Sequence, residues 1–368
     1  MPVGEWPADG ETRGPTAASA ATKQARPHRN YRTLHNVLVL LSGQIDGYPL
    51  GSPRPSPNDR GPTVTESKPD SPGGPEDAGL TNLTAEQIDD LVLYETVDSH
   101  IAVITLNRPE RHNAMLAPDS FLELRRKVER AEDDDDIKVI VLTGSGDSFC
   151  AGVDLRRTPV EDAGLKPGER LPQSRRMRMA SYGAPNLLKC DKTVIAAVNG
   201  PCVAAGFHFV ISCDLIVAGA GARFGEPESR IGFAGFSPGW PLLALKLGIN
   251  RARSMLLTGR LVTAEQLEAW GVVDSVVPPE QLMDEALRYA RMVAWHSTDN
   301  LMLGRRSMQL FYELLGITAY DTWTSIAHPL FTNVVWRDDE FNFMRERNKS
   351  SVGEALGEIQ RQWSEMGF

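Results

Sequence analysis

The sequence has few cysteines, no long apolar run and no excess of positive charge. Its four cysteines show no CxxC spacing and lie in apolar or mixed segments, which predicts reduced, buried thiols in a cytoplasmic protein. No apolar run approaches the roughly 20 residues of a membrane helix, and the early acidic residues do not fit a signal peptide. A formal net charge of −9 argues against broad nucleic-acid binding. The 368 residues, 41% of them hydrophobic, therefore predict a globular protein with a substantial core.

The composition divides the chain into three regions. Residues 1–88 are rich in Pro, Gly, Ser, Thr and Ala and include SPRPSPNDRGP and DSPGGPEDAG, which is typical of a disordered tail. A start codon assigned too far upstream would also explain this stretch. We expect an ordered core over residues 89–280 and a helical region over 281–368.

Short apolar runs alternate with turns and helical patterns along the core. Residues 101–106, 139–143 and 193–198 are apolar and β-branched, and each run ends at a Gly-, Asn- or Pro-containing turn, as buried strands do. Pro118 can open a helix, because apolar residues recur after it at helical spacing. The order of elements predicts an α/β core with the active groups on the connecting loops.

Two loops carry small residues next to predicted strand or helix ends. In one, Ala204, Ala205 and Gly206 begin a helix directly after a strand and turn. The first amides of a helix lack intrahelical acceptors, so small residues there allow an oxyanion to approach the backbone. In the other loop, Ala151 and Gly152 offer a similar approach. Together they predict an oxyanion hole, although tight helix packing would also account for the small residues.

Several motifs then identify a family resemblance. They are LNRPERHNAM, SFCAGVDL, VIAAVNGPCVAAG, CDLIVAG, FGEPE and LLTGRLVTAEQLEAWGVVDSVVP. Their order and spacing resemble those of the crotonase, or enoyl-CoA hydratase/isomerase, superfamily. The resemblance implies an α/β spiral of stacked ββα units with a C-terminal helical, oligomer-forming region. It also implies an acyl-CoA thioester substrate, a homotrimer or homohexamer, and no metal or redox cofactor.

Matching positions assign roles to individual residues. The resemblance places the oxyanion amides on Val153 and Ala205 and the acid–base carboxyl on Glu228. Family hydratases carry a second glutamate where this chain has His208, and a glycine triplet where it has Ala204-Ala205-Gly206. Residues expected to line the substrate site are Ala151, Gly152, Gly206, Phe233 and Trp240.

The reaction stays open at this point. A His208/Glu228 pair permits hydration, whereas Glu228 alone is enough to move a double bond. The motifs favour an acyl-CoA enzyme of the hydratase/isomerase type, and the alternatives are hydrolysis or carbon–carbon cleavage of a CoA thioester and a non-catalytic crotonase-like scaffold. His208 is flanked by phenylalanines and can instead be a core residue. Glu226, two positions before Glu228, is a rival carboxyl, and Glu228 can instead cap the following segment or pair with Arg230.

Other charged and aromatic residues have weaker assignments. Residues 156–178 are rich in arginine and are placed to meet the phosphates of a nucleotide-bearing thioester, or else form a solvated loop. We expect Asp154 and Asp214 to be structural. In the family, C-terminal helices cover a neighbouring core, which gives Trp323, Phe331 and Trp336 an interface role unless they pack within the chain.

Overall fold

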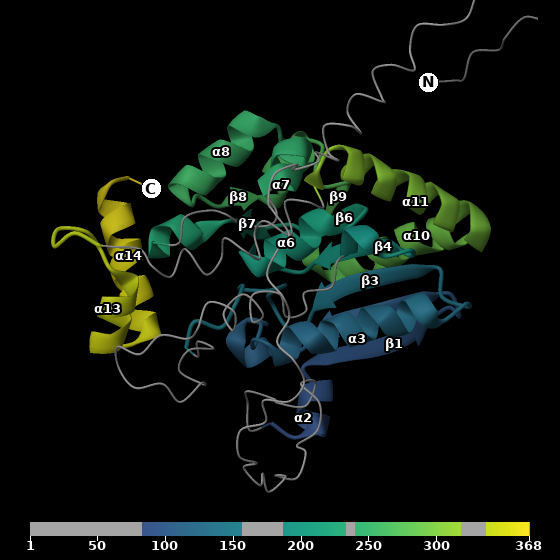
Figure 1. Ribbon diagram of the computed structural model, residues 1–368, viewed down its shortest axis with the longest axis horizontal. Coiled ribbons are helices and arrows are strands. Elements are labelled where there is room, and N and C mark those ends of the chain that lie inside the picture. The colour runs from purple at the N-terminus through teal and green to yellow at the C-terminus, as the bar shows by residue number, and fades with distance from the viewer. Residues whose placement is uncertain (1–82, 157–186, 233–239, 318–335, 368) are drawn as a thin grey trace, which may run out of the picture. The chain divides into compact units, whose positions relative to one another are not determined.

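The computed structural model describes residues 83–156, 187–232, 240–317 and 336–367 (Figure 1). Its main sheet has the strand order β1-β2-β3-β4-β6-β9, antiparallel between β1 and β2 and parallel elsewhere. A second sheet has the order β5-β7-β8. The strands are β1 (Val92–Val97), β2 (Ile101–Leu106), β3 (Val139–Gly144), β4 (Thr193–Val198), β5 (Cys202–Val203), β6 (Leu215–Gly219), β7 (Arg223–Gly225), β8 (Val262–Thr263) and β9 (Ser275–Val277). The three predicted strands are confirmed as β2, β3 and β4.

The helices expected after Pro118 and at Ala204 are confirmed as α3 and α6. The described helices are α2 (Ala85–Asp89), α3 (Asp119–Asp133), α6 (Ala205–Ser212), α7 (Trp240–Leu247), α8 (Ile249–Thr258), α9 (Ala264–Ala269), α10 (Leu282–Ala294), α11 (Thr298–Leu314), α13 (Phe343–Lys349) and α14 (Val352–Glu365). Short 3₁₀ segments are η1 (Pro109–Arg111), η2 (Leu187–Lys189), η3 (Pro227–Ile231) and η4 (Pro279–Gln281). Among the described helices, none has the length and apolarity needed to cross a bilayer.

Helices cover both faces of the main sheet. Because side chains alternate along a strand, Val139 and Val141 of β3 face one side and Ile140 and Leu142 the other. The first pair packs with α10, and the second pair joins α3 and α6 in the larger core. This burial on both faces explains why β2, β3 and β4 are nearly continuous apolar runs.

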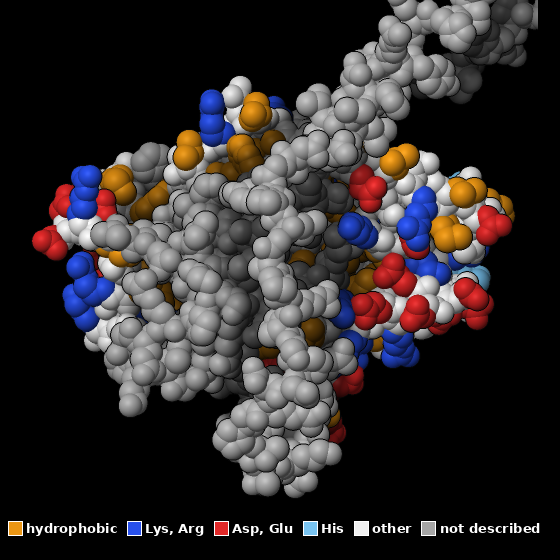
Figure 2. Space-filling view, viewed as in Figure 1, with side chains coloured by type: hydrophobic (Ala, Val, Ile, Leu, Met, Phe, Trp, Pro, Cys, Tyr) orange, Lys and Arg blue, Asp and Glu red, His pale blue; other side chains and the backbone are white. Residues whose placement is uncertain are grey.

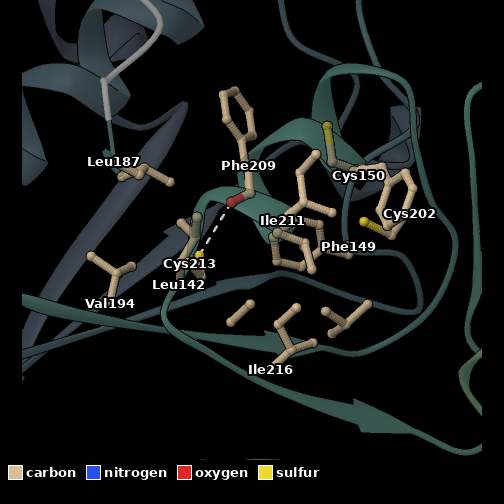
Figure 3. Close-up of a cluster of buried hydrophobic side chains, with 14 of the residues drawn as sticks. Leu142, Phe149, Cys150, Leu187, Val194, Cys202, Phe209, Ile211, Cys213 and Ile216 are labelled. Carbon is tan, nitrogen blue, oxygen red and sulfur yellow. Dashed lines mark hydrogen bonds between the residues drawn. The ribbon is translucent and has the colours of Figure 1, made fainter. Parts of the chain in front are cut away.

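The stretch around α6 lies in the interior of the larger core (Figure 3). Figure 3 shows Cys150, Cys202 and Cys213 among apolar side chains, and the Cys213 thiol donates a hydrogen bond of 3.2 Å to the Phe209 carbonyl oxygen. All four cysteines are free and buried, as predicted. Burial raises the pKa of Cys150 to about 12, so this thiol is not a nucleophile near neutral pH.

The last two described helices pack on their own chain. Phe343 of α13 and Ile359 of α14 form a small core with Leu155 and Ile231. An added Cβ at Gly232 would lie 1.7 Å from the Trp336 ring, so Trp336 packs within the chain. Trp336 thus follows the intrachain alternative, and the expectation that such helices cover a neighbouring core stays a prediction. Trp323, Phe331 and most of the predicted tail, 1–88, lie outside the described residues.

Candidate functional site

The two predicted oxyanion loops lie against each other. Gly152 has a φ of +89°, and a Cβ added there would lie 2.8 Å from the Ala204 Cβ and 3.8 Å from the Ala205 nitrogen. A Cβ added at Gly206 would lie 2.6 Å from the Cys150 Cβ. Both glycines are therefore required for the close approach of the loops. The sequence predicted this juxtaposition, although it gave no distance.

Backbone and side-chain bonds fix the first loop. The Met115 amide donates to the Gly152 oxygen at 2.8 Å, and the Asp154 amide donates to the Met115 oxygen at 2.9 Å. Arg108 forms an ion pair with Asp154 at 3.2 Å, in agreement with the structural role predicted for Asp154. These bonds anchor both neighbours of Val153. Among the hydrogen bonds of the described residues, none uses the Val153 amide as donor.

The second amide opens helix α6. Ala205 is its first residue, so its amide has no acceptor within the helix. The preceding residue, Ala204, has a φ of 53° and a ψ of −125°, a conformation that glycine adopts far more readily than alanine. This backbone shape agrees with the glycine that the family has at that position. The amides of Val153 and Ala205 thus belong to two adjoining loops.

A compact cluster of titratable side chains includes the predicted acid–base residues. His208 lies on α6, Glu226 directly precedes η3, and Glu228 lies within η3. One donor atom from each of the three residues lies within 4.8 Å of the others. His208 Nε2 is 2.7 Å from Glu226 Oε1. The structure therefore brings His208 and Glu228 together, and it adds Glu226, which the sequence suggested only as a rival of Glu228.

Burial changes the protonation of all three groups. The side chain of Glu226 is 0% exposed and that of His208 is 18% exposed. Burial, reinforced by the neighbouring Glu226 carboxyl, raises the pKa of Glu228 to about 8. Burial also raises the pKa of Glu226 well above its usual value. It lowers the pKa of His208, although the negative charge of Glu228 acts in the opposite direction. Near neutral pH the cluster therefore offers a protonated carboxyl beside a neutral imidazole.

The same three side chains are also a possible set of metal ligands. Imidazole and carboxylate donors suit divalent transition metals. Two ligands of a tetrahedral zinc ion lie about 3.4 Å apart, given metal–ligand bonds of about 2.0 to 2.2 Å. The 2.7 Å between His208 Nε2 and Glu226 Oε1 is instead a hydrogen-bond distance. The geometry favours an acid–base cluster.

The remaining predicted residues have varied positions. Ala151 is half-buried in the first loop, whereas Trp240 begins α7 and packs against the larger core. Phe233 and all of the arginine-rich stretch except Arg156 lie outside the described residues. Asp214 is structural, as predicted, since it accepts a hydrogen bond of 2.8 Å from the Val194 amide.

A cleft beside the first loop is lined by charges of both signs. Its volume is about 480 Å³, and its charged lining consists of three arginines and three carboxylates: Arg108, Arg111, Arg156, Asp90, Glu110 and Asp154. The sequence predicted a phosphate-binding role only for the segment that starts at Arg156. The two earlier arginines were missed, because they follow a different strand and join the cleft only in the folded chain.

Helices α13 and α14 cover both flanks of the site. Arg347 of α13 donates a hydrogen bond of 2.9 Å to the Leu155 oxygen, just after the first oxyanion loop. The guanidinium of Arg230, two residues after Glu228, lies 4.0 Å from the centre of the Trp363 ring of α14. The same chain thus supplies the oxyanion loops, the acid–base cluster and part of their cover.

Comparisons with known proteins agree with these features. The family model described as enoyl-CoA hydratase/isomerase matches residues 96–324. A mevalonyl-coenzyme A hydratase of Beauveria bassiana is 36% identical over 57% of this chain and 75% of its own length. A putative enoyl-CoA hydratase of Thermus thermophilus is 37% identical over 57% of this chain and 81% of its own. An enoyl-CoA hydratase structure from Mycobacterium smegmatis has a TM-score of 0.63 at 26% identity, covering 74% of this chain and 94% of that one.

Proposed function

Because the chain belongs to the enoyl-CoA hydratase/isomerase family and is an enzyme of the hydratase type acting on CoA thioesters, we propose that it adds water across the double bond of an enoyl-CoA. The observation that carries this proposal is the cluster of His208 and Glu228, in which a protonated carboxyl lies beside a neutral imidazole. Hydration needs one group that accepts a proton from water and another that gives a proton to carbon.

The proposed reaction begins with polarisation of the thioester. The Val153 and Ala205 amides donate hydrogen bonds to the thioester oxygen, on which negative charge grows as the enolate forms. Loss of one such donor typically costs about 3 kcal/mol of transition-state stabilisation. Backbone donors are suited to this task because they are fixed before the reaction starts, and both loops are held by the contacts described above.

Water then adds across the double bond. His208 takes a proton from water, whose oxygen bonds to the β-carbon, and the π electrons move through the α-carbon into the thioester. Glu228 gives its proton to the α-carbon as the enolate collapses. The product is a 3-hydroxyacyl-CoA, and transfer of the proton from His208 to Glu228 restores the starting enzyme. One water is consumed, and no oxidant or reductant is required.

Product analysis separates hydration from the competing reactions. Purified protein is incubated with 2-enoyl-CoA, 3-enoyl-CoA and β-oxoacyl-CoA thioesters, and the products are identified by mass spectrometry and thiol detection. Hydration predicts a gain of one water by 2-enoyl-CoA without release of free CoA. A shifted double bond would indicate an isomerase, free CoA a hydrolase, and binding without turnover a scaffold. Each of these three results contradicts the proposal.

The acyl group and the setting of the reaction are further parts of the proposal. Because one relative is named mevalonyl-coenzyme A hydratase, we add mevalonyl-CoA to the substrate panel. It is tested for the reverse reaction, the loss of water. The arginine-containing cleft is the proposed site for the phosphates of CoA. We also propose a cytoplasmic homotrimer or homohexamer. Of these, the phosphate site is supported by the three arginines of the cleft lining, and the assembly rests on the family.

A further inference from the structure

Glu226 has no role in the reaction proposed above, yet it is the most deeply buried group of the acid–base cluster. Its side chain is 0% exposed and its Oε1 lies 2.7 Å from His208 Nε2. Burying a carboxyl group away from water is costly unless a partner compensates for the lost hydration. The partner here is an imidazole that the proposed function places in the reaction.

We propose that Glu226 is a positioning residue that holds the imidazole of His208 through Nε2 and makes His208, Glu226 and Glu228 exchange protons as one unit. This inference rests on the proposed function, because it assigns Glu226 a part in the same reaction. It goes beyond that function in one respect, since it gives the chain a third titratable group where the resemblance predicts two.

The contact with Glu226 determines which nitrogen of His208 is basic. A neutral imidazole has one protonated and one unprotonated nitrogen. In the form of the cluster in which Glu226 is ionised, Nε2, which lies 2.7 Å from Oε1, carries the proton and Nδ1 is the nitrogen that accepts a proton from water. The carboxylate then stabilises the imidazolium that forms, as a buried acid does for the histidine of a catalytic triad. Glu226 therefore acts through His208 and does not touch the substrate.

Glu226 also influences Glu228. The Glu226 carboxyl is one of the causes that raise the pKa of Glu228, after burial. The groups that face Glu226 are His208 from α6, Glu228 from η3 and Cys202 from β5. Burial raises the pKa of Cys202 well above its usual value, so this thiol stays neutral. The titratable groups that remain in the cluster are therefore one histidine and two glutamates.

The first test is the pH profile of Glu226→Gln. Glutamine keeps the size of the side chain but cannot ionise, so Glu228 loses a neighbour that raises its pKa. We expect the limb of the kcat profile that reports Glu228 to move to lower pH by about one unit. We also expect kcat to fall at least tenfold, with KM changed less than twofold, because Glu226 is remote from the CoA moiety. A folded variant with the wild-type pH profile would overturn the inference.

A second variant separates charge from position. Glu226→Asp keeps the carboxylate but withdraws it from His208 by one methylene. We expect a reduced kcat with a pH limb close to that of the wild type, and a wild-type kcat would contradict the positioning role. This variant also keeps the inference testable should Glu226→Gln fail to fold. In a double variant, Glu226→Gln should add little to the loss caused by His208→Gln, because both remove one interaction.

A matched control is available outside the site. Glu123 is another buried carboxyl, paired with Lys127 at 3.1 Å on α3. Glu123→Gln should lower stability without moving the pH profile. Loss of activity in Glu228→Gln tests the proposed function separately. An active-site role for Glu228 together with a wild-type profile for Glu226→Gln would reject this inference alone.

Discussion

At the scale of single residues, the backbone of Ala204 is the least relaxed part of the site. Its φ of 53° and ψ of −125° suit glycine, and a strained residue of this kind costs on the order of 1 to 3 kcal/mol. Glycine at this position relieves the strain but increases the entropy of the unfolded chain. We therefore expect Ala204→Gly to raise the free energy of unfolding by up to about 1 kcal/mol, measured by denaturant titration.

The neighbouring residue provides the control for this prediction. Ala205 starts α6 with no positive φ, so Ala205→Gly should leave the free energy of unfolding unchanged or lower it by about 1 kcal/mol. Equal destabilisation by both substitutions would show that Ala204 is not strained.

The residues of the site differ in how far the sequence predicted them. Val153, Ala205, Glu228 and His208 follow from motifs, each of which is local in sequence. The contact between His208 and Glu226 does not, because it depends on how the chain leaves β7 and enters η3 beside α6. The backbone changes from strand to 3₁₀ helix between β7 and η3. The two-residue spacing of Glu226 and Glu228 in the sequence therefore does not show that both carboxyls lie close to the His208 imidazole.

At the scale of elements, a buried arginine ties α11 to the core. The Arg305 guanidinium pairs with Asp214 and donates to the carbonyl oxygens of Cys190 at 3.1 Å and Leu187 at 2.8 Å. Removing one partner of a buried ion pair leaves the other charge without compensation. We expect Arg305→Met to lower the free energy of unfolding by about 3 to 5 kcal/mol, measured by denaturant or thermal unfolding.

The next residue along α11 is a suitable control. Arg306 pairs with Asp191, but its side chain is 62% exposed. Arg306→Met should therefore change the free energy of unfolding by no more than about 1 kcal/mol. Similar losses in the two variants would contradict the anchoring role of Arg305.

The sequence predicted elements better than their contacts. Periodicity and turn signals are local properties, so the helices expected after Pro118 and at Ala204 are found as α3 (Asp119–Asp133) and α6 (Ala205–Ser212). The faces that helices bury depend on residues far away in the chain. For that reason the packing of α14 against η3, through Trp363 and Arg230, was not predicted.

At the scale of the whole molecule, α11 presents apolar side chains to solvent. Leu303, Leu310 and Leu314 recur at helical spacing and are 68%, 56% and 79% exposed. Figure 2 shows hydrophobic side chains over α8 and α11 on this face. An exposed apolar stripe of this kind is typical of a protein–protein interface. Helix α11 is therefore a candidate for contact with a second copy.

Substitution of the stripe tests the proposed assembly. We expect the combined change Leu303→Gln, Leu310→Gln and Leu314→Gln to reduce the mass measured by analytical ultracentrifugation from three or six chains to one. Leu356→Gln, which alters an exposed leucine of α14, should leave the mass unchanged. A wild-type assembly that already has the mass of one chain, or a triple variant that keeps the larger mass, would refute this role of α11.

Turnover of 2-enoyl-CoA by Glu228→Gln decides whether this carboxyl moves the proton. Glutamine preserves the shape of the side chain but can neither give nor take the proton that the α-carbon requires. We predict that kcat falls by about 10² to 10⁴-fold with little change in KM, while Glu123→Gln keeps the wild-type kcat. A Glu228→Gln enzyme with wild-type kcat would contradict the proton-transfer role of Glu228, on which the proposed hydration depends.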